Sequence, residues 1–404
     1  MLNGFRQEVA LRRFQKTCSS VFILPHSLAR IQKEFPMSDQ QSKRLLSLDV
    51  FRGITIAGMV LVNDAGDWGH VYEPLEHAPW NGLTPTDLIF PFFMFIVGVS
   101  MMLSFAKRRE SGIADRTLFR HVIVRSVVIF AVGVFLYAFP FFDIGTMRIM
   151  GVLQRIAVAY FLASSIYFAF DRRGIRWWIA GILIGYWAAM KFIPVPGVGA
   201  GVWTPEGNIS GYVDRIFLSG HMWYQTKTWD PEGLLSTVPS IATVLLGVLA
   251  GFELRSPRPL HEKINGFFSW GVAAVIGALL VNPFFPINKN LWTSSYVLVT
   301  GGLALIGLAC CMYIIEVKER KTWAKPFVIL GVNAIAAYAF ASLLSTTIST
   351  IRIGSRSLQE IIYNNLFGWI SDPFVKSVSF AAAFVVVTWA FAWILYRKKW
   401  FIKI

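Results

Sequence analysis

The segment that follows the first apolar stretch of the chain is dense in side chains that can exchange protons. It reads NDAGDWGHVYEPLEHAPWNGLTPTDLIFP and begins at Asn63. His77 is the strongest candidate for a catalytic group, because an imidazole can accept a proton from an amine or an alcohol at neutral pH. Either Glu76 or Asp87 could orient its ring and raise its basicity. The alternative interpretation is a solvent-exposed histidine without a chemical role.

The segment gives little indication of a metal site. His70 stands seven residues before His77, without supporting cysteines or an HxxxH pattern, so we expect no metal. The three cysteines are Cys18, Cys310 and Cys311, a spacing that offers no disulfide framework. The other polar side chains of the segment, Trp80 and Asn81 among them, are candidates for substrate binding.

A second candidate site is a stripe of arginines in RIMGVLQRIAVAY. Arg148, Gly151 and Arg155 stand at i, i+3 and i+7, so they share one face of a helix, with Gln154 adjacent. The two guanidinium groups would lie roughly 10 Å apart along the helix axis. Because arginine offers phosphates two parallel hydrogen bonds, the pattern favours a diphosphate or another extended polyanion. The alternative is a structural arginine paired with a carbonyl or an acid of another helix.

Other polar residues stand inside or at the ends of apolar stretches, where charge is costly. In SLDVFRG, Asp49 and Arg52 are three residues apart and can pair, either as a structural ion pair or as the entrance for an anionic ligand. Asn333 could line a cavity. In DPEG, Asp230 and Glu232 are interpreted as the N-cap and first turn of a helix.

The composition is that of a membrane protein. Of 404 residues, 55% are hydrophobic and 15% are charged, and the mean hydropathy is +0.54. We therefore predict an all-α, polytopic helical membrane protein with about ten transmembrane helices, each close to the roughly 20 residues that cross a bilayer. The predicted spans are about 46–65, 86–106, 121–141, 147–170, 176–194, 233–253, 265–285, 292–315, 326–348 and 376–396.

The distribution of lysine and arginine predicts the orientation. These residues are dense in the connections 107–120, 171–176, 254–264 and 316–325 and after residue 396, and sparse in the alternate connections. The positive-inside rule puts both termini in the cytoplasm and the loop from Asn63 to Asp87 outside. The net charge of +15 then indicates a basic surface against anionic lipid, and no nucleic-acid partner is expected. We expect a multi-pass protein of the cell's inner (cytoplasmic) membrane.

Residues 1–40 are basic and are predicted to form a disordered N-terminal tail, followed by a transmembrane domain over residues 41–404. Met37 would make a more natural start, so a mis-assigned N-terminus and an organellar transit peptide are alternatives for residues 1–36. The P-loop, GxGxxG, HExxH and GxSxG motifs are absent from the sequence. ATP-driven pumping, dinucleotide redox chemistry, zinc proteolysis and serine hydrolysis therefore lack their signatures.

Four segments carry a family resemblance: SLDVFRGITIAGMVLVN, EHAPWNGLTPTDLIFPFFMFIVGVS, RIMGVLQRIAVAY and DPEGLLSTVPSIATVLLG. They resemble the bacterial branch of the heparan-alpha-glucosaminide N-acetyltransferase family, part of a transmembrane acyltransferase superfamily, over residues from about 45 to 397. The resemblance implies transfer of an acetyl group from acetyl-CoA to an amino sugar, with His77 matching the family's active histidine and Asn63 beside it. We expect no counterpart of the lysosomal enzyme's luminal domain and extra first span, and a glucosamine-containing oligosaccharide or cell-wall fragment as the acceptor rather than heparan.

The residues and the resemblance together predict a membrane acetyltransferase active at the extracytoplasmic face. His77 would act as general base or as acetyl carrier, and Asn63 could stabilise the oxyanion. The predicted substrate and acetyl-CoA contacts are Asp49, Arg52, Trp80, Asn81, Asp87, Arg148, Gln154, Arg155 and Asn333. The alternatives are a transporter of N-acetylglucosamine or related amino sugars and an O-acetyltransferase of surface polysaccharide. A homodimer is compatible with the sequence.

Overall fold

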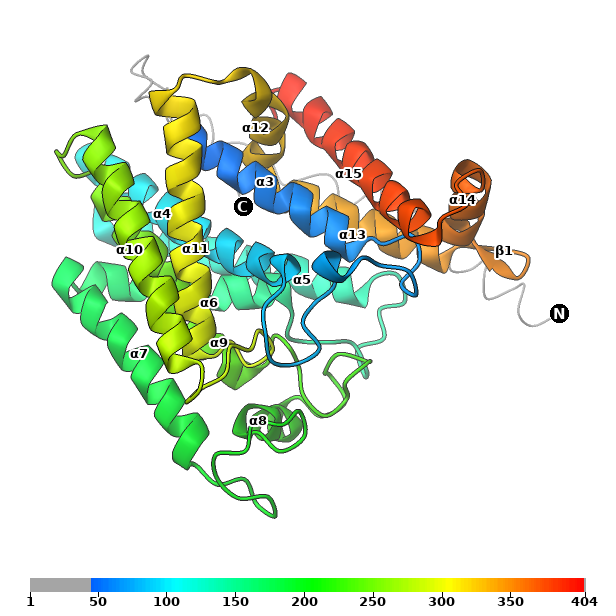
Figure 1. Cartoon of the computed structure of the whole chain (residues 1–404), viewed down its shortest axis with the longest axis horizontal. Helices are drawn as coiled ribbons and strands as arrows, with labels where there is room; N and C mark the ends of the chain where they lie inside the picture. Colours follow the sequence, from blue (N-terminus) through cyan, green and yellow to red (C-terminus); the bar gives the residue numbers. More distant parts are fainter. Residues whose placement is uncertain (1–44, 403–404) are drawn as a thin grey trace. The chain divides into compact units, whose positions relative to one another are not determined.

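The structure, a computed structural model, describes residues 45–402. This part of the chain is built from helices, with one antiparallel hairpin of strands β1 (Arg352–Ile353) and β2 (Arg356–Ser357) (Figure 1). The long helices are α3 (Leu46–Asn63), α4 (Ile89–Glu110), α5 (Asp115–Ala138), α6 (Val152–Ala169), α7 (Arg172–Phe192), α9 (Leu234–Leu254), α10 (Leu260–Val281), α11 (Ser294–Met312), α13 (Ala334–Thr350) and α15 (Pro373–Arg397). The shorter ones are η1 (Glu73–Leu75), η2 (Pro85–Leu88), α8 (Ile209–Phe217), η3 (Tyr313–Val317), η4 (Thr322–Ala324), α12 (Lys325–Val332) and α14 (Leu358–Phe367). The predicted tail over residues 1–40 lies outside the described residues.

Every predicted span overlaps a long helix or the pair of α12 and α13, and the all-α polytopic fold is confirmed. By length and composition, 8 helices of the described part could cross a membrane, or up to 9 if the bent pair of α12 and α13 counts as one span. That pair bends by 74° at Asn333, a break that the apolar run 326–348 did not predict. The predicted span 176–194 falls on α7, whose 21 residues include arginines, a lysine and three tryptophans, and α7 is outside the set of 8.

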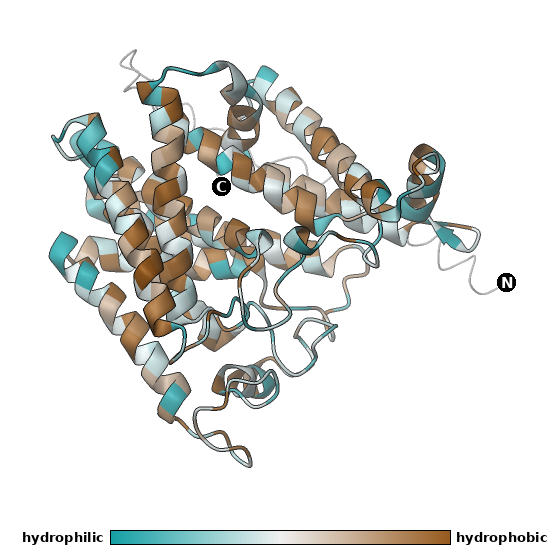
Figure 2. Ribbon diagram, in the orientation of Figure 1, coloured by the Kyte–Doolittle hydropathy of each residue, from teal (hydrophilic) through white to brown (hydrophobic). Residues whose placement is uncertain are grey.

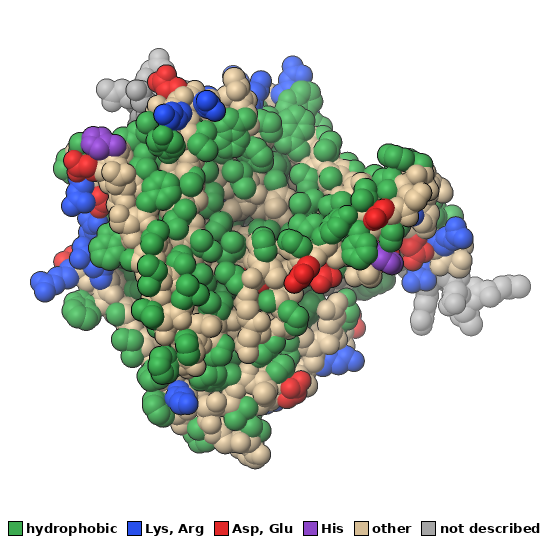
Figure 3. Space-filling model, viewed as in Figure 1, with side chains coloured by type: hydrophobic (Ala, Val, Ile, Leu, Met, Phe, Trp, Pro, Cys, Tyr) green, Lys and Arg blue, Asp and Glu red, His purple; other side chains and the backbone are tan. Residues whose placement is uncertain are grey.

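The outer surfaces of several long helices are apolar. Large side chains such as Val127 of α5, Ile184 of α7, Leu280 of α10 and Val386 of α15 are each more than 60% exposed. Hydrophobic residues run along the helices, and hydrophilic ones gather at helix ends and in loops (Figure 2). On the face drawn in Figure 3, hydrophobic side chains cover most of the surface and charged ones lie mainly at its edges. An apolar surface of this extent is suited to lipid.

Helices α4 and α9 pack with their backbones in contact. A Cβ atom at Gly98 of α4 would collide with the carbonyl oxygen of Val244, and one at Gly247 of α9 would collide with that of Phe95. Small residues at such a crossing let helices approach closely and pack by van der Waals contact. The crossing fixes α4 against α9, and the polar residues of the candidate site lie just before the N-termini of both helices.

Candidate functional site

A histidine and an aspartate form a hydrogen-bonded pair at the entrance to α4. Nδ1 of His77 lies 2.7 Å from Oδ1 of Asp87, whose side chain is 1% exposed, whereas that of His77 is 47% exposed. The second oxygen, Oδ2, accepts hydrogen bonds from the backbone N–H groups of Ala78 (3.1 Å) and Thr84 (3.0 Å). The turn η2 thus fixes the carboxylate, and the carboxylate fixes the imidazole. Of the two predicted partners, Asp87 makes the contact, and Glu76 is exposed.

A lysine from a distant loop completes this group. Nζ of Lys289, in the connection between α10 and α11, lies 2.9 Å from Nε2 of His77. Burial lowers the pKa of Lys289, while Glu232 and Asp87 act to raise it. Lys289 was not among the predicted site residues. It could have been noticed because lysine and arginine are sparse in the connections predicted to lie outside the membrane.

The loop of Lys289 is held to the segment that carries His77. The backbone N–H of Gly82 donates to the carbonyl of Ile287 at 2.8 Å, and Nδ2 of Asn288 donates to Oδ1 of Asn81 at 3.1 Å. The amide oxygen of Asn81, a predicted substrate contact, therefore holds the Lys289 loop in place by accepting this hydrogen bond from Asn288. These two contacts are made by the two residues that precede the lysine, and they hold its loop against the His77 segment.

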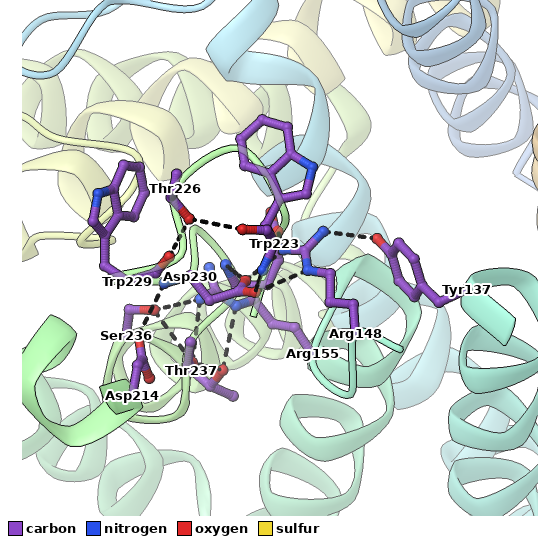
Figure 4. Close-up of polar contacts among 12 residues, drawn as sticks. Tyr137, Arg148, Arg155, Asp214, Trp223, Thr226, Trp229, Asp230, Ser236 and Thr237 are labelled. Atoms are coloured by element: carbon purple, nitrogen blue, oxygen red, sulfur yellow. Dashed lines mark hydrogen bonds and ion pairs between the residues drawn. The ribbon is translucent and has the colours of Figure 1, made fainter. Parts of the chain in front are cut away.

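Arg148 lies in a cluster of acids rather than on a helical stripe (Figure 4). Its Nε donates to Oδ2 of Asp230 at 2.9 Å, its Nη2 pairs with both Asp230 and Glu232, and its Nη1 donates to the hydroxyl of Tyr137 at 2.9 Å. Burial would raise the pKa of Glu232, but Arg148 and Arg155 together hold it below its usual range. Arg148 is therefore a structural arginine paired with acids of another segment, which was the alternative to a phosphate-binding stripe.

Two sequence predictions about this cluster are wrong. Helix α6 begins at Val152, with Gly151 as its extended N-cap, so Arg148 precedes the helix and shares no face with Arg155. Helix α9 begins at Leu234 with Gly233 as its N-cap, so Asp230 and Glu232 precede it too. Both acids instead form ion pairs with the guanidinium of Arg148, which lies in a segment far from them in the sequence.

Arg155 is buried in α6 and points to the first turn of α9 (Figure 4). It donates to the hydroxyls of Ser236 and Thr237 and lies 4.9 Å from the ring centroid of Trp292. Its Nη1 atom has no hydrogen-bond partner in the described part of the chain. The neighbouring Gln154 is also fully buried, and neither of its amide atoms has a partner among residues 45–402.

Trp80 links the histidine segment to the Arg148 cluster. Its Nε1 donates to the carbonyl of Trp203 at 2.8 Å, and its ring packs edge-on against Trp229 at 5.0 Å between centroids. Trp229 directly precedes Asp230. The His77 segment and the cluster are therefore joined by packing as well as by charge.

The structure does not bring Asn63 to His77. Asn63 is the exposed last residue of α3, and no hydrogen bond joins it to His77 within residues 45–402. In the same range, no three His, Cys, Asp or Glu side chains group as metal ligands.

The three remaining predicted residues lie away from His77. Arg52 of α3 donates to Oδ1 of Asp49 and to the carbonyl of Gly331, both at 3.1 Å. Asn333 is buried at the break between α12 and α13, where its Oδ1 accepts from the backbone N–H of Ile402 at 3.0 Å. Asp49 stands in the first turn of α3, whereas the segment that carries His77 follows the other end of that helix. Arg52 thus joins α3 to α12, and Asn333 holds the C-terminal segment after α15.

Asp64, next to Asn63, is buried beside Ser345 of α13, and burial raises its pKa to about 7. Because the folded pKa lies above the ordinary 3.8, the stability that this group contributes is complete below about pH 4 and is lost as the pH rises to about 7. We expect Asp64→Asn to remove this slope and to be more stable than the parent at pH 8 by up to ~4 kcal/mol. Unfolding free energies of parent and variant at pH 5 and pH 8 measure this difference.

The same change of unfolding free energy with pH in parent and variant would contradict the prediction. Asp67→Asn is the control, because His70 lowers the pKa of Asp67, an exposed neighbour of Asp64.

Comparisons with known proteins agree with the sequence motifs. Residues 44–209, which include His77, Asp87 and Arg155, match the family model described as heparan-alpha-glucosaminide N-acetyltransferase, catalytic. Heparan-alpha-glucosaminide N-acetyltransferase of Mus musculus is 28% identical over all of this chain, and that of Homo sapiens is 30% identical over 89% of it. The chain spans 67% of the mouse protein and 60% of the human one. The chain is therefore similar to the heparan-alpha-glucosaminide N-acetyltransferases, as its motifs predict.

Proposed function

We propose that the protein transfers an acetyl group from acetyl-CoA to the amine of a glucosamine-containing acceptor at the extracytoplasmic side of the inner membrane. The observation that carries the proposal is the pairing of His77 with the buried Asp87, within the segment that matches the catalytic family model. The names of the relatives support an acetyl donor and an amino-sugar acceptor. The acceptor's identity and the sidedness of the reaction are our inference.

In this reaction Asp87 keeps the imidazole of His77 oriented through Nδ1, so that Nε2 accepts the proton of the attacking amine. A C–N bond forms as the C–S bond of the thioester breaks, and the thiolate of coenzyme A leaves and takes up a proton. Lys289, 2.9 Å from Nε2, supplies positive charge where the carbonyl oxygen becomes negative. Lys289, rather than the exposed Asn63, is therefore our candidate for stabilising the oxyanion.

A second route has Nε2 of His77 take the acetyl group first and pass it to the amine. The two routes differ in one measurable property. Exchange of labelled coenzyme A into acetyl-CoA without acceptor occurs only if the acetyl group rests on the enzyme. The same dyad serves both routes, because the imidazole must be oriented and basic in each.

The structure changes which residues could bind acetyl-CoA, because Arg148 and Arg155 do not form the predicted stripe. Arg148 has its hydrogen-bonding groups taken up by Asp230, Glu232 and Tyr137, so it is a poor phosphate ligand. Arg155 keeps a buried Nη1 without a partner in the described chain, and such an orphaned donor fits a carbonyl or phosphate oxygen. We therefore assign the donor contact to Arg155 rather than to the pair.

The direct test is release of coenzyme A by the purified protein when acetyl-CoA and glucosamine are supplied together. Acetylated glucosamine and free thiol should form in equal amounts. Uptake of N-acetylglucosamine into proteoliposomes without acetyl-CoA, in the absence of thiol release, would instead favour the transporter.

Asp87→Asn tests the positioning of the imidazole. We expect kcat to fall by about 10²-fold with KM nearly unchanged, because the amide cannot hold the ring as the carboxylate does. Glu76→Gln is the matched control. It neutralises Glu76, the exposed acid that precedes His77 in the sequence, and its kcat should equal that of the parent. Equal kcat values for the two variants would argue against the dyad.

A further inference from the structure

A cavity of about 100 Å³ lies between helices α5, α6 and α13. All of its lining side chains are uncharged, and His77 is not among them. The polar and small lining residues are Gly133, Tyr137, Gln154, Tyr338, Ser342 and Thr346. A volume of this size and polarity can hold a ligand group or water.

The amide of Gln154 faces this cavity. Its side chain is fully buried, and neither Oε1 nor Nε2 has a hydrogen-bond partner in the described chain. A Cβ atom at Gly133 would lie 2.5 Å from Oε1, so the glycine provides the room that the amide occupies. Leaving both atoms of a buried amide unpaired is costly, which indicates that a group from outside the protein completes its hydrogen bonds.

The opposite wall is a stripe of hydroxyl groups. Tyr338, Ser342 and Thr346 follow one another at intervals of four on α13, so they share one face of that helix. Within residues 45–402, no hydrogen bond to another side chain uses these hydroxyls. The stripe extends over about 12 Å. The cavity is therefore lined on one side by hydroxyls and on the other by an amide.

One wall of the cavity joins the Arg148 cluster. The hydroxyl of Tyr137 accepts a hydrogen bond from Arg148 at 2.9 Å (Figure 4). Tyr137 also lines the cavity. Through Glu232, this cluster is electrostatically linked to Lys289, which contacts His77. A ligand group in the cavity would thus lie beside Tyr137, one hydrogen bond away from the Arg148 cluster.

We propose that this cavity is a subsite for a secondary amide of a substrate. The amide of Gln154 offers one donor and one acceptor, which match the C=O and N–H of such a group, and the α13 hydroxyls can satisfy its remaining lone pair. A phosphate, carboxylate or ammonium group would lack a charged partner there. The inference rests on the proposed function, whose reaction involves two molecules with secondary amides: the pantetheine arm of coenzyme A and the acetamido group of the N-acetylated sugar.

Titration calorimetry with three probes tests the subsite. Coenzyme A and N-acetylglucosamine carry the amide, whereas glucosamine lacks it. We expect Gln154→Leu to raise the Kd of an amide-bearing probe about 10-fold and to leave that of glucosamine unchanged. A rise with coenzyme A assigns the cavity to the donor, and a rise with N-acetylglucosamine assigns it to the product.

Thr388→Val is the matched control, because Thr388 of α15 is equally buried and its hydroxyl also has no partner in the described chain, yet it does not line the cavity. Its Kd values should equal those of the parent. Unchanged Kd values for all three probes in Gln154→Leu would overturn the subsite and leave the cavity to water.

A second measurement does not depend on the folding of the Gln154 variant. Ser342→Cys, made with Cys18, Cys310 and Cys311 replaced by alanine, introduces a thiol into the cavity wall. We expect coenzyme A or N-acetylglucosamine to slow its reaction with a methanethiosulfonate at least several-fold, and glucosamine to have no effect. Protection without acetyl transfer would refute the proposed reaction and keep the subsite. Transfer without protection would refute the subsite and keep the reaction, and labelling that no probe slows overturns the subsite in either case.

Discussion

Replacing His77 by alanine is expected to lower kcat for acetyl transfer by about 10³-fold, within the range that a positioned acid–base group contributes. The loss follows in either route, since the imidazole is the proton acceptor in one and the acetyl carrier in the other. Folding should be preserved, because the side chain is 47% exposed and packs little. The measurement is release of coenzyme A by the purified protein with glucosamine.

The chain supplies its own control for this variant. His70 lies in the same connection, and its Nδ1 is 2.8 Å from Oδ2 of Asp67. The two histidines are similarly exposed, but Asp67 is 40% exposed whereas Asp87 is buried. His70→Ala should transfer acetyl groups at the parental rate. Full activity of His77→Ala, or an equal loss in His70→Ala, would contradict the role that we assign to His77.

The largest effect on stability is expected for Arg148→Gln. The substitution leaves Asp230 and Glu232 without their cation, and the side chains of these acids are 0% and 7% exposed. Removing one partner of a buried pair costs about 3–5 kcal/mol, because the remaining charge stays buried. The unfolding free energy of the purified protein in one detergent, followed by tryptophan fluorescence, measures this cost.

The control for Arg148 is an exposed ion pair of the same kind. Arg258 contacts Glu253 at 3.2 Å with its own side chain 62% exposed, so Arg258→Gln should cost less than about 1 kcal/mol. Arg148→Gln should also regain stability as the pH falls, because protonation removes the uncompensated carboxylate charge. A cost below about 1 kcal/mol for Arg148→Gln, or one that does not change with pH, would show that the cluster is hydrated.

The helices could be predicted from the sequence, and most of the contacts between them could not. Apolar runs of about 20 residues identify the spans. Because lipid offers no hydrogen-bond partners, the backbone in these runs must bond to itself as a helix. Asp87 could be named as a partner of His77 because it stands only ten residues away. The partners of Arg148, by contrast, are 82 and 84 residues distant, and spacing in the sequence carries no information about them.

The errors have a common physical origin. The helix assumed over 147–170 begins only at Val152, because the extended Gly151 and the pairing of Arg148 with distant acids outweigh local helical periodicity. The break at Asn333 is hidden in an apolar run because hydropathy does not report backbone direction. Lys289 escaped notice because its proximity to His77 depends on the contact between Gly82 and Ile287, which only the folded chain reveals.

The backbone contact between α4 and α9 has a consequence for how the molecule can move. Two helices that interlock at Gly98 and Gly247 cannot slide or rock past each other without losing that crossing. The connection that bears the imidazole lies outside this crossing, so the crossing does not restrict it directly. The crossing nevertheless gives the segment that carries His77 and Asp87 a rigid base at the N-terminus of α4.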